Sequence, residues 1–266
     1  MSTIPDSIQA AGRVTLTIEA GIAMIRFDRP AAHNAMTWAM YEQLEAACQQ
    51  IEDDPTVKLA VLRGVGGKAF VAGTDISQFH AFQSGEDGLA YERRIDGFIK
   101  ALEALPVPTL AVVEGYAVGG GLAIATACDL RIAVTGARFG VPIARTLGNC
   151  LSAGNIRRLC ATLGVSWVKR MLLLAEMPTA EQLAPLGYIE RIVPAAELDA
   201  ALAQLCAKLL SHAPLSMRAS RETIRRLATD PTADISDLIR SCYGSQDFHA
   251  GIIAFGEKRP ASWQGR

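Results

Sequence analysis

The chain has 266 residues, of which 26 are basic and 27 acidic, and half of its residues are apolar. This length suits one large hydrophobic core, or one domain with a smaller appendage, and the composition is that of a globular protein rather than a disordered one. The formal net charge of −1 gives no support to nucleic-acid binding or to attachment at a membrane surface as the main role.

The chain begins with a segment, residues 1–12, that has neither the basic nor the apolar part of a secretory signal. No apolar run approaches the length that crosses a bilayer, so we expect a cytoplasmic protein. Two β-branched runs follow at residues 14–18 and 22–27, joined at 19–21, which predicts a β-hairpin. Thr37 then caps a predicted helix whose apolar side chains recur every three or four positions.

Short strands and helices alternate through the first two thirds of the chain, which favours a mixed α/β core. The further strands expected there lie at residues 59–62, 69–72, 109–113 and 130–134. Residues 79–92 are polar and irregular, and a longer helix through Ile95 and Leu102 is expected to follow them. The glycines at residues 119–121 open a helix of small residues.

Helical patterns dominate after about residue 152, with one more strand at residues 189–193. The last helical patterns, which have no strand among them, cover residues 198–210, 215–227 and 235–243. We expect them to form a layer on the core or on a neighbouring subunit. The predicted organisation is therefore an α/β core over residues 1–200 and a helical C-terminal region over residues 201–266.

Cysteine and histidine usage gives no sign of a metal site. The six cysteines have no Cys-x-x-Cys spacing and are interpreted as small core residues in a reducing compartment. The four histidines stand alone without the spacing of metal ligands, so we expect no metal.

The most informative segments are residues 68–76 and 114–123, in each of which a strand ends at glycine and turns at once into a helix. Such a junction leaves N–H groups free at a helix N-terminus, where the helix dipole also favours negative charge. Two of these junctions that converge would form an oxyanion hole. The alternative is that Gly119 to Gly121 only permit close packing and that Asp75 only caps a helix. The segment lacks the Gly-x-Gly-x-x-Gly pattern of dinucleotide binding.

Taken together, six motifs resemble the enoyl-CoA hydratase/isomerase (crotonase) superfamily over nearly the whole chain. In chain order they are Asp28-Arg-Pro-x-x-x-Asn-Ala, Ala69-Phe-Val-Ala-Gly-Thr-Asp-Ile, Gly115-Tyr-Ala-Val-Gly-Gly-Gly, Ala127-Cys-Asp-Leu-Arg-Ile, Ala137-Arg-Phe-Gly-Val-Pro and Ile253-Ala-Phe-Gly-Glu-Lys-Arg-Pro. The resemblance implies a spiral of ββα units with a helical C-terminal trimerisation region, assembled as a homotrimer or a dimer of trimers. It also implies an acyl-CoA thioester substrate and no cofactor other than the coenzyme A of that substrate.

The resemblance also assigns site residues. It places the oxyanion-hole donors on the backbone of Thr74 and Gly120. Contacts with CoA or the acyl group are implied at Arg29, Ala31, Ala72, Asp75, Ile76, Tyr116, Gly119, Ile143 and Lys258. For Lys258 a plain surface charge is an equal alternative. Tyr116 is expected to pack in the core, with contact between its hydroxyl and the acyl group as the alternative.

The sequence departs from the family pattern at the two positions where typical hydratases carry catalytic glutamates. Ala123 stands at the first position and Ile143 at the second, and neither side chain can transfer a proton. Two-glutamate hydration is therefore not supported. The proton-transfer residue is left unassigned.

Two other side chains are hypothetical participants. Cys150 follows Gly148-Asn149 in the turn where superfamily dehalogenases, which also lack both glutamates, place a nucleophile. The competing interpretation, a small buried cysteine, is the commoner role of a free thiol. His80 lies in the polar segment that often covers the acyl group in the superfamily, and an imidazole suits acid–base work near neutral pH.

Several functions remain open at this point. The leading hypothesis is an acyl-CoA enzyme of the hydratase/isomerase type that stabilises a thioester enolate. Other superfamily reactions are dehalogenation, thioester hydrolysis, decarboxylation and C–C cleavage. A CoA-ester-binding protein that has lost its chemistry is the alternative outside enzymes.

Overall fold

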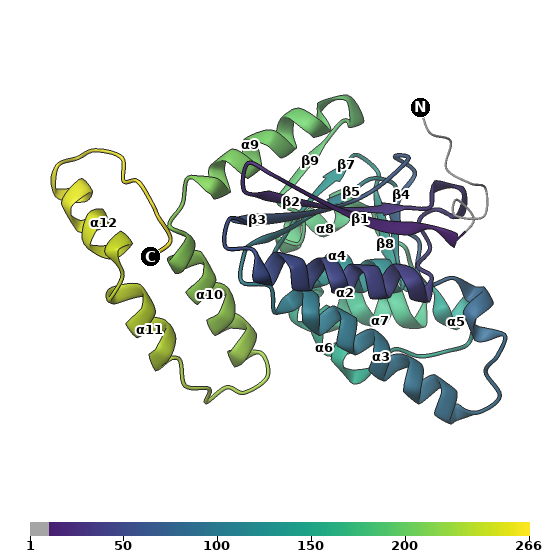
Figure 1. The fold of residues 1–266 in the computed structure, drawn as a ribbon. Helices are drawn as coiled ribbons and strands as arrows, with labels where there is room; N and C mark the ends of the chain where they lie inside the picture. The colour runs from purple at the N-terminus through teal and green to yellow at the C-terminus, as the bar shows by residue number, and fades with distance from the viewer. Residues whose placement is uncertain (1–10) are drawn as a thin grey trace.

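A computed structural model describes residues 11–266 and contains two β-sheets surrounded by helices (Figure 1). The larger sheet has six strands in the order β1-β2-β3-β5-β7-β9. Its strands are β1 (Arg13–Glu19), β2 (Ile22–Asp28), β3 (Leu59–Gly64), β5 (Thr109–Val113), β7 (Leu130–Val134) and β9 (Arg191–Val193). The first two pair antiparallel and confirm the predicted hairpin, whereas every later neighbour pairs parallel.

The smaller sheet consists of three parallel strands, β4 (Ala69–Val71), β6 (Tyr116–Val118) and β8 (Arg138–Gly140). Consecutive strands alternate between the two sheets, because β3, β5 and β7 belong to the larger sheet and β4, β6 and β8 to the smaller one. This repeat is the predicted spiral of ββα units. Sequence analysis missed β6 and β8 because strands of three residues are too short to show a period of two.

The helices of the core confirm most of the predicted elements. They are α2 (Trp38–Asp53), α3 (Gly85–Glu103), α4 (Gly120–Ala127), α5 (Ile143–Thr146), α6 (Ala153–Leu163), α7 (Val165–Leu173), α8 (Ala180–Leu183) and α9 (Leu198–Leu210). Short 3-10 turns cover Pro30–Ala32, Ile76–Phe79, Ala184–Leu186 and Ala195–Glu197. Thr37 caps α2 as predicted, since its side chain accepts a hydrogen bond from the N–H of Met40.

One predicted boundary is wrong. The segment expected to be irregular as far as residue 92 is already helical from Gly85 onward. The reason is a capping box, in which the Ser84 side chain and the Asp87 carboxylate each accept a hydrogen bond from the other residue's backbone N–H. The polar composition concealed this start, because the first turns of α3 are largely exposed.

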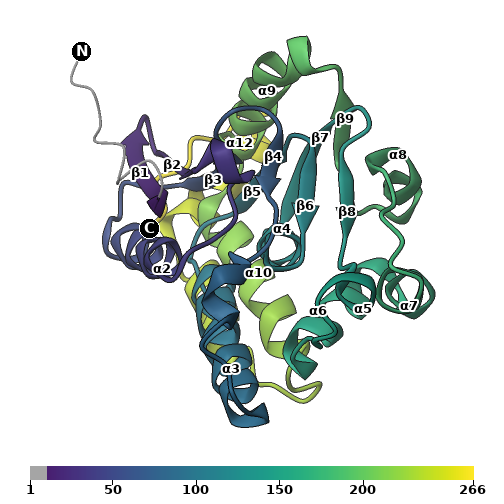
Figure 2. The same cartoon turned by 90° about the vertical axis from the view of Figure 1, so that its right-hand side faces the viewer.

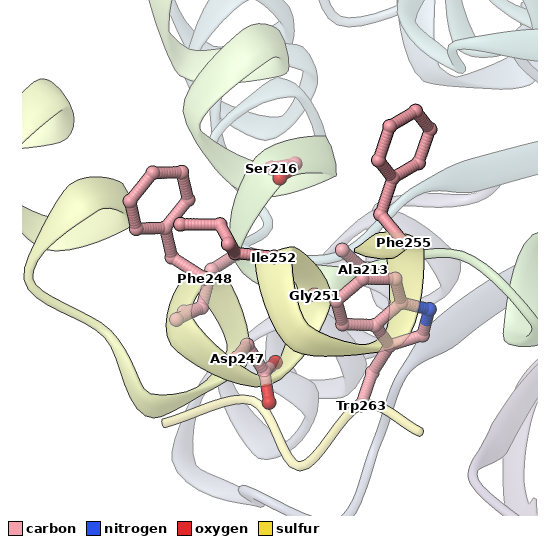
Figure 3. A pocket seen from close by; sticks show the side chains of 9 residues that line it. Ala213, Ser216, Asp247, Phe248, Gly251, Ile252, Phe255 and Trp263 are labelled. Atoms are coloured by element: carbon pink, nitrogen blue, oxygen red, sulfur yellow. The ribbon is translucent and has the colours of Figure 1, made fainter. Parts of the chain in front are cut away.

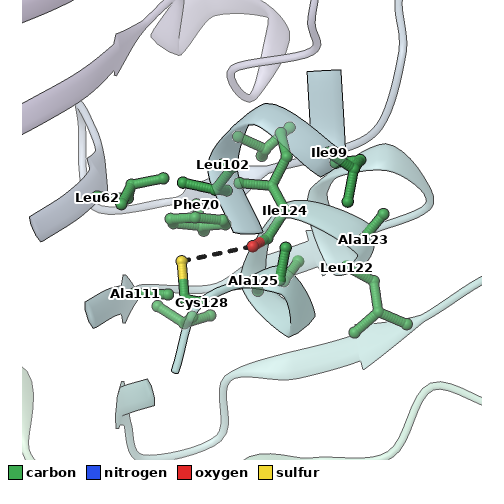
Figure 4. Close-up of a cluster of buried hydrophobic side chains, with 14 of the residues drawn as sticks. Leu62, Phe70, Ile99, Leu102, Ala111, Leu122, Ala123, Ile124, Ala125 and Cys128 are labelled. Atoms are coloured by element: carbon green, nitrogen blue, oxygen red, sulfur yellow. Dashed lines mark hydrogen bonds between the residues drawn. The ribbon is translucent and has the colours of Figure 1, made fainter. Parts of the chain in front are cut away.

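The main core lies between the sheets and the helices that cover them. Figure 4 shows Leu62, Phe70, Ile99 and Leu102 packed around the small side chains of α4. A second cluster on the other face of the larger sheet is covered by α9, which supplies buried residues such as Leu198 and Leu205. The predicted division after residue 200 falls within α9, and it remains a prediction.

The C-terminal region is helical, as expected, and comprises α10 (Pro214–Leu227), α11 (Ser236–Tyr243) and α12 (Gln246–Gly256). Figure 1 shows these helices projecting away from the sheets, and in the turned view of Figure 2 α10 and α12 lie behind the core. An ion pair of 2.6 Å between Arg221 of α10 and Asp129 joins them to the core. The same Asp129 carboxylate accepts from the N–H of Thr109, so this residue has a structural role.

The prediction about a secretory signal concerned residues 1–12, and most of that segment lies outside the described residues. In the part of the chain that the structure describes, no helix is both long and apolar enough to span a membrane. The cytoplasmic location stays a prediction.

Candidate active site

The two glycine-bearing turns lie side by side. One follows β4 at Gly73 and Thr74, the other follows β6 at Gly119 and Gly120, and these strands are neighbours in the smaller sheet. A β-carbon added to Gly119 would lie 3.8 Å from the Cα of Gly73, and one added to Gly120 would lie 3.4 Å from Oγ1 of Thr74. Because parallel strands end at the same edge of a sheet, both turns open onto one space.

The first turn leaves the amide of Thr74 without an acceptor among residues 11–266. Met36 bonds the backbone on either side of it, since its N–H donates to the carbonyl of Gly73 at 2.8 Å and its carbonyl accepts from the N–H of Asp75 at 2.9 Å. This parallel bridge fixes the turn, and the N–H of Thr74 takes no part in it. The amide therefore remains available to a bound group.

The second turn places the amide of Gly120 at the start of α4. The first intrahelical hydrogen bond runs from the N–H of Ala123 to the carbonyl of Gly119, at 3.0 Å. The N–H of Gly120 precedes this ladder and is one of the helix's free N-terminal donors. Gly119 itself has φ of +53°, in the left-handed region that a side chain rarely adopts.

Close packing accounts for part of this glycine run. A β-carbon on Gly121 would lie 1.9 Å from the carbonyl oxygen of Val71, so α4 packs directly on β4. A β-carbon on Gly120 would lie 2.4 Å from the hydroxyl oxygen of Tyr41. The sequence left packing and anion stabilisation as alternatives. Packing explains Gly121 by itself, whereas the free amide of Gly120 also suits an anion.

Hydrogen bonds among the hydroxyl groups of Thr74, Tyr41 and Tyr91 fix the side chain of the first turn. Oγ1 of Thr74 lies 2.9 Å from the hydroxyl oxygen of Tyr41 on α2 and 2.7 Å from that of Tyr91 on α3. Burial raises the pKa of Tyr91 to about 12 and raises the pKa of Tyr41 further. Both phenols therefore stay protonated at neutral pH and fix the Thr74 side chain. Sequence analysis missed both tyrosines, because they are brought together only by the fold.

The residues implied in CoA binding meet beside the first turn. The Arg29 guanidinium and the Asp75 carboxylate form an ion pair of 2.6 Å. Burial by itself raises the pKa of Asp75, but hydrogen bonds from Ser77 and the pairing with Arg29 outweigh burial and hold that pKa below its usual value. The N–H of Ala72 donates to the carbonyl of His33, at 3.1 Å. The segment that contains Arg29 and Ala31 thus runs along the segment from Ala72 to Ile76.

Asp75 also caps the following turn, as the alternative interpretation expected. Its carboxylate accepts from the N–H of Ser77 at 2.9 Å. The same side chain therefore shapes the turn after Thr74 and fixes Arg29. Beyond it, Ile76 is 57% exposed, so an apolar side chain faces solvent next to this ion pair.

A large cavity of about 870 Å³ lies between α3 and the segment from residue 147 to 153. This is within the size range of ligand pockets in proteins. Its apolar lining comes mainly from Phe79, Phe82, Leu89, Tyr91, Leu147 and Leu151. Cys150 also lines it and is exposed, so the interpretation of Cys150 as a buried core residue is wrong.

A smaller cavity adjoins the second turn and shares Tyr91, Glu92 and Leu151 with the large one. It is lined by Tyr91, Glu92, Ile95, Gly119, Gly120, Ala123, Leu151, Asn155 and Leu159. The small cavity therefore connects the amide of Gly120 with the face of α3. Sequence analysis did not identify Glu92, although its spacing from Ile95, Ile99 and Leu102 places it on the buried face of α3.

Other predicted residues lie apart from these cavities. His80 is exposed after the Ile76–Phe79 turn and lines neither cavity. Tyr116 is 44% exposed in β6, so the expectation that it packs in the core is wrong. Ile143 begins α5 and packs partly against the core. Lys258 follows α12 in the C-terminal region, where it is exposed.

A separate hollow of about 350 Å³ lies in the C-terminal region, between α10 and α12 (Figure 3). Phe248, Ile252, Phe255 and Trp263 give it an apolar lining. Its one carboxylate, Asp247, already accepts from the N–H groups of Gln264 and Gly265. This hollow has no group placed for catalysis among the residues that line it.

Comparison with known proteins agrees with this geometry. A sequence model described as enoyl-CoA hydratase/isomerase matches residues 17–266. The chain belongs to the enoyl-CoA hydratase/isomerase family.

Named relatives and solved structures of this family cover nearly the whole chain. A short-chain-enoyl-CoA hydratase of Clostridium acetobutylicum is 31% identical, over 92% of this chain and 95% of its own length. A crotonyl-CoA hydratase of Syntrophomonas wolfei is also 31% identical, over 94% and 97%. The crystal structure of an enoyl-CoA hydratase/carnithine racemase of Magnetospirillum magneticum superposes with a TM-score of 0.88 at 29% identity, covering 95% of this chain and 96% of that one.

This member of the enoyl-CoA hydratase/isomerase family carries no titratable side chain at either position where the sequence pattern led us to seek a glutamate. Ala123 is almost fully buried in the wall of the small cavity, and Ile143 begins α5. The cavity nevertheless contains one carboxyl group, that of Glu92 on α3.

Proposed function

We propose that this protein is an acyl-CoA enzyme of the enoyl-CoA hydratase/isomerase type. In this proposal the thioester oxygen is held between the N–H groups of Thr74 and Gly120, and negative charge develops on it as an enolate forms. The observation that supports it is the adjacency of two turns whose amides have no acceptor among residues 11–266. Such a donor typically stabilises a transition state by about 3–4 kcal/mol.

The two halves of the substrate would occupy different parts of the site. We propose that CoA lies along the backbone of Arg29, Ala31, Ala72, Asp75 and Ile76, where the Arg29–Asp75 ion pair holds two chain segments together. The acyl group would extend past Gly119 into the large cavity, whose lining is mainly apolar. The relatives named above are enoyl-CoA hydratases, and an unsaturated acyl thioester is accordingly the proposed substrate class.

A heavy-water experiment tests this function. The protein is incubated in heavy water with a panel of acyl- and enoyl-CoA thioesters, and the products are read by mass spectrometry. Deuterium at the α-carbon is expected, because an enolate exchanges its proton with solvent. Samples without protein serve as the control for spontaneous exchange.

The same measurement separates the alternatives. Loss of halide or release of free CoA would favour another reaction of the superfamily. Cys150, which lines the large cavity, would then be the candidate nucleophile. Binding of several thioesters without any change in mass would contradict the proposed function and favour a CoA-ester-binding protein.

We further propose that the chain forms a homotrimer or a dimer of trimers through α10–α12. The support is the number of large apolar side chains that these helices expose in one copy, such as Phe255 at 87% and Ile224 at 70%. Monomeric soluble proteins seldom expose large apolar patches, and a larger patch usually marks an interaction surface. Lys258 would then lie near a neighbouring copy, as the resemblance implied.

Removal of this apolar surface should dissociate the assembly. The double substitution Ile253→Ser and Phe255→Ser should shift the mass measured by light scattering after size exclusion from about three or six chains to one, because the buried apolar area is the main gain on association. Ser262→Ala, at an exposed position in the same region, is the matched control. A wild-type protein that is a single chain at micromolar concentration would contradict this assembly.

A further inference from the structure

Glu92 contributes a carboxyl group to the small cavity. It lies on α3, and three residues of that helix line the cavity opposite Gly119, Gly120 and Ala123 of the second turn. Tyr91 and Glu92 are the titratable residues among those that line this cavity. Since burial raises the pKa of Tyr91 to about 12, the phenol stays protonated at neutral pH. Glu92 is the group there that can exchange a proton under physiological conditions.

One oxygen of the Glu92 carboxylate accepts a hydrogen bond, and the other oxygen is available to accept a proton. Oε2 of Glu92 accepts a hydrogen bond of 2.7 Å from the N–H of Ser152. Among residues 11–266, Oε1 has no hydrogen-bond partner. A general base needs both features, because one contact fixes its direction and a free lone pair accepts the proton.

The surroundings of Glu92 favour the protonated carboxyl group. Burial raises its pKa, the N–H of Ser152 lowers it, and the negative charge of Asp96, one turn further along α3, raises it again. Asp96 accepts from the Ser152 hydroxyl at 2.8 Å and lies 3.9 Å from the Arg158 guanidinium of α6. In the large cavity, Tyr91, Arg93 and Cys150 are the other ionisable groups that share the wall with Glu92 and Asp96. A carboxyl group whose pKa lies nearer to neutrality is a stronger base when ionised.

We propose that Glu92 is the proton-transfer residue of this site, a role that rests on the function proposed above. Its Oε1 removes a proton from the carbon next to the thioester, and the electrons of that C–H bond form the C=C bond of the enolate. The electron pair of the C=O bond moves to oxygen, between the amides of Thr74 and Gly120. The carboxylic acid so formed returns its proton to carbon.

This single carboxyl group suits a proton shift. If the carboxylic acid exchanges its proton with solvent and then returns a solvent proton to the carbon next to the thioester, the result is isotope exchange. If the proton is instead delivered to the γ-carbon of a 3-enoyl thioester, the double bond migrates to the 2-position. Neither outcome needs water as a nucleophile or a second base. The role of Glu92 therefore predicts that migration of the double bond exceeds hydration.

The test compares wild type with Glu92→Gln in heavy water, with 3-hexenoyl-CoA and hexanoyl-CoA as substrates. Glutamine retains an oxygen that accepts from the N–H of Ser152, so the contact of α3 with this segment is preserved, but the amide cannot transfer a proton. Deuterium incorporation and double-bond migration should fall by at least about 100-fold, while the Kd for hexanoyl-CoA measured by calorimetry stays within about threefold. Glu86→Gln is the matched control, since it makes the same charge change on the same helix at an exposed position outside both cavities, and it should retain full exchange.

The outcomes are distinct. If wild type exchanges deuterium and Glu92→Gln exchanges it equally fast, the role of Glu92 is overturned and the proposed function stands. If wild type binds thioesters but exchanges nothing, the proposed function falls and the role of Glu92 falls with it.

A second measurement needs no variant. The exchange rate of wild type should rise with pH through a midpoint above the ordinary glutamate value of 4.5, because only the ionised carboxylate accepts a proton and its pKa is raised. A rate that does not change between pH 4.5 and pH 8 would overturn the role even if Glu92→Gln did not fold.

Discussion

Replacing Gly120 with alanine should lower kcat/KM for an enoyl-CoA thioester by about 100- to 1,000-fold, the usual effect of losing one oxyanion-hole donor. The new β-carbon would lie 2.4 Å from the hydroxyl oxygen of Tyr41 and 3.4 Å from Oγ1 of Thr74. Tyr41 is fully buried and stacked on Phe98 at 5.4 Å, so it cannot move aside. The backbone of Gly120 must move instead, and its amide is then displaced from the amide of Thr74.

A second glycine gives the matched control. Gly97 lies within α3, and apart from its chain neighbours and the backbone of its own helix no atom lies within 4 Å of an added β-carbon. Gly97→Ala should leave kcat/KM unchanged and should raise the free energy of unfolding by about 0.5–1 kcal/mol, because alanine loses less backbone entropy in a helix. Circular dichroism establishes that both variants are folded. Full activity in a folded Gly120→Ala protein would show that the position of this amide does not determine the rate.

Replacing Arg131 with methionine should lower the free energy of unfolding by about 3 kcal/mol. Arg131 is buried in β7, and its guanidinium donates to four backbone carbonyls and lies over the ring of Tyr188. Two of these carbonyls, those of Ala125 and Cys128, are at the C-terminal end of α4, where a cation also opposes the negative end of the helix dipole. Methionine fills similar space but leaves these acceptors buried without donors.

Chemical denaturation followed by tryptophan fluorescence measures this change. Arg138→Met is the control, since Arg138 is an exposed residue of β8 whose guanidinium donates to the carbonyl of Met177. It should cost less than about 0.5 kcal/mol, as surface substitutions usually do. Equal losses in the two variants would contradict the structural role of Arg131.

Sequence patterns predicted the elements whose signals are local. The Thr37 cap, the apolar spacing of α2 and the turn between β1 and β2 each involve residues close in the chain, so a short window contains the whole signal. The same reasoning failed for β6 and β8, which have three residues each, and for the first turns of α3, where a polar face hid a capping box.

The family motifs pointed to two turns that the structure places side by side, but they did not indicate the side chains that surround these turns. Tyr41, Tyr91 and Glu92 carry no motif, and they approach the turns only because α2 packs on α3 and α3 packs on α4. Cys150 and Tyr116 were expected to be buried on the basis of residue type alone, and both are exposed. Burial depends on which elements cover a residue, and composition does not contain that information.

The amino-acid sequence by itself determined the mixed α/β fold class, since apolar periodicities are local requirements of the backbone, and its motifs led to the family by resemblance. The tertiary structure alone decided which groups share the site. Gly120 begins α4, Glu92 lies on α3 and Thr74 lies in the turn after β4, so the contacts around them depend on packing between distant segments. Whether a carboxyl group can take the place of a missing glutamate depends on such distances, and a linear pattern does not specify them.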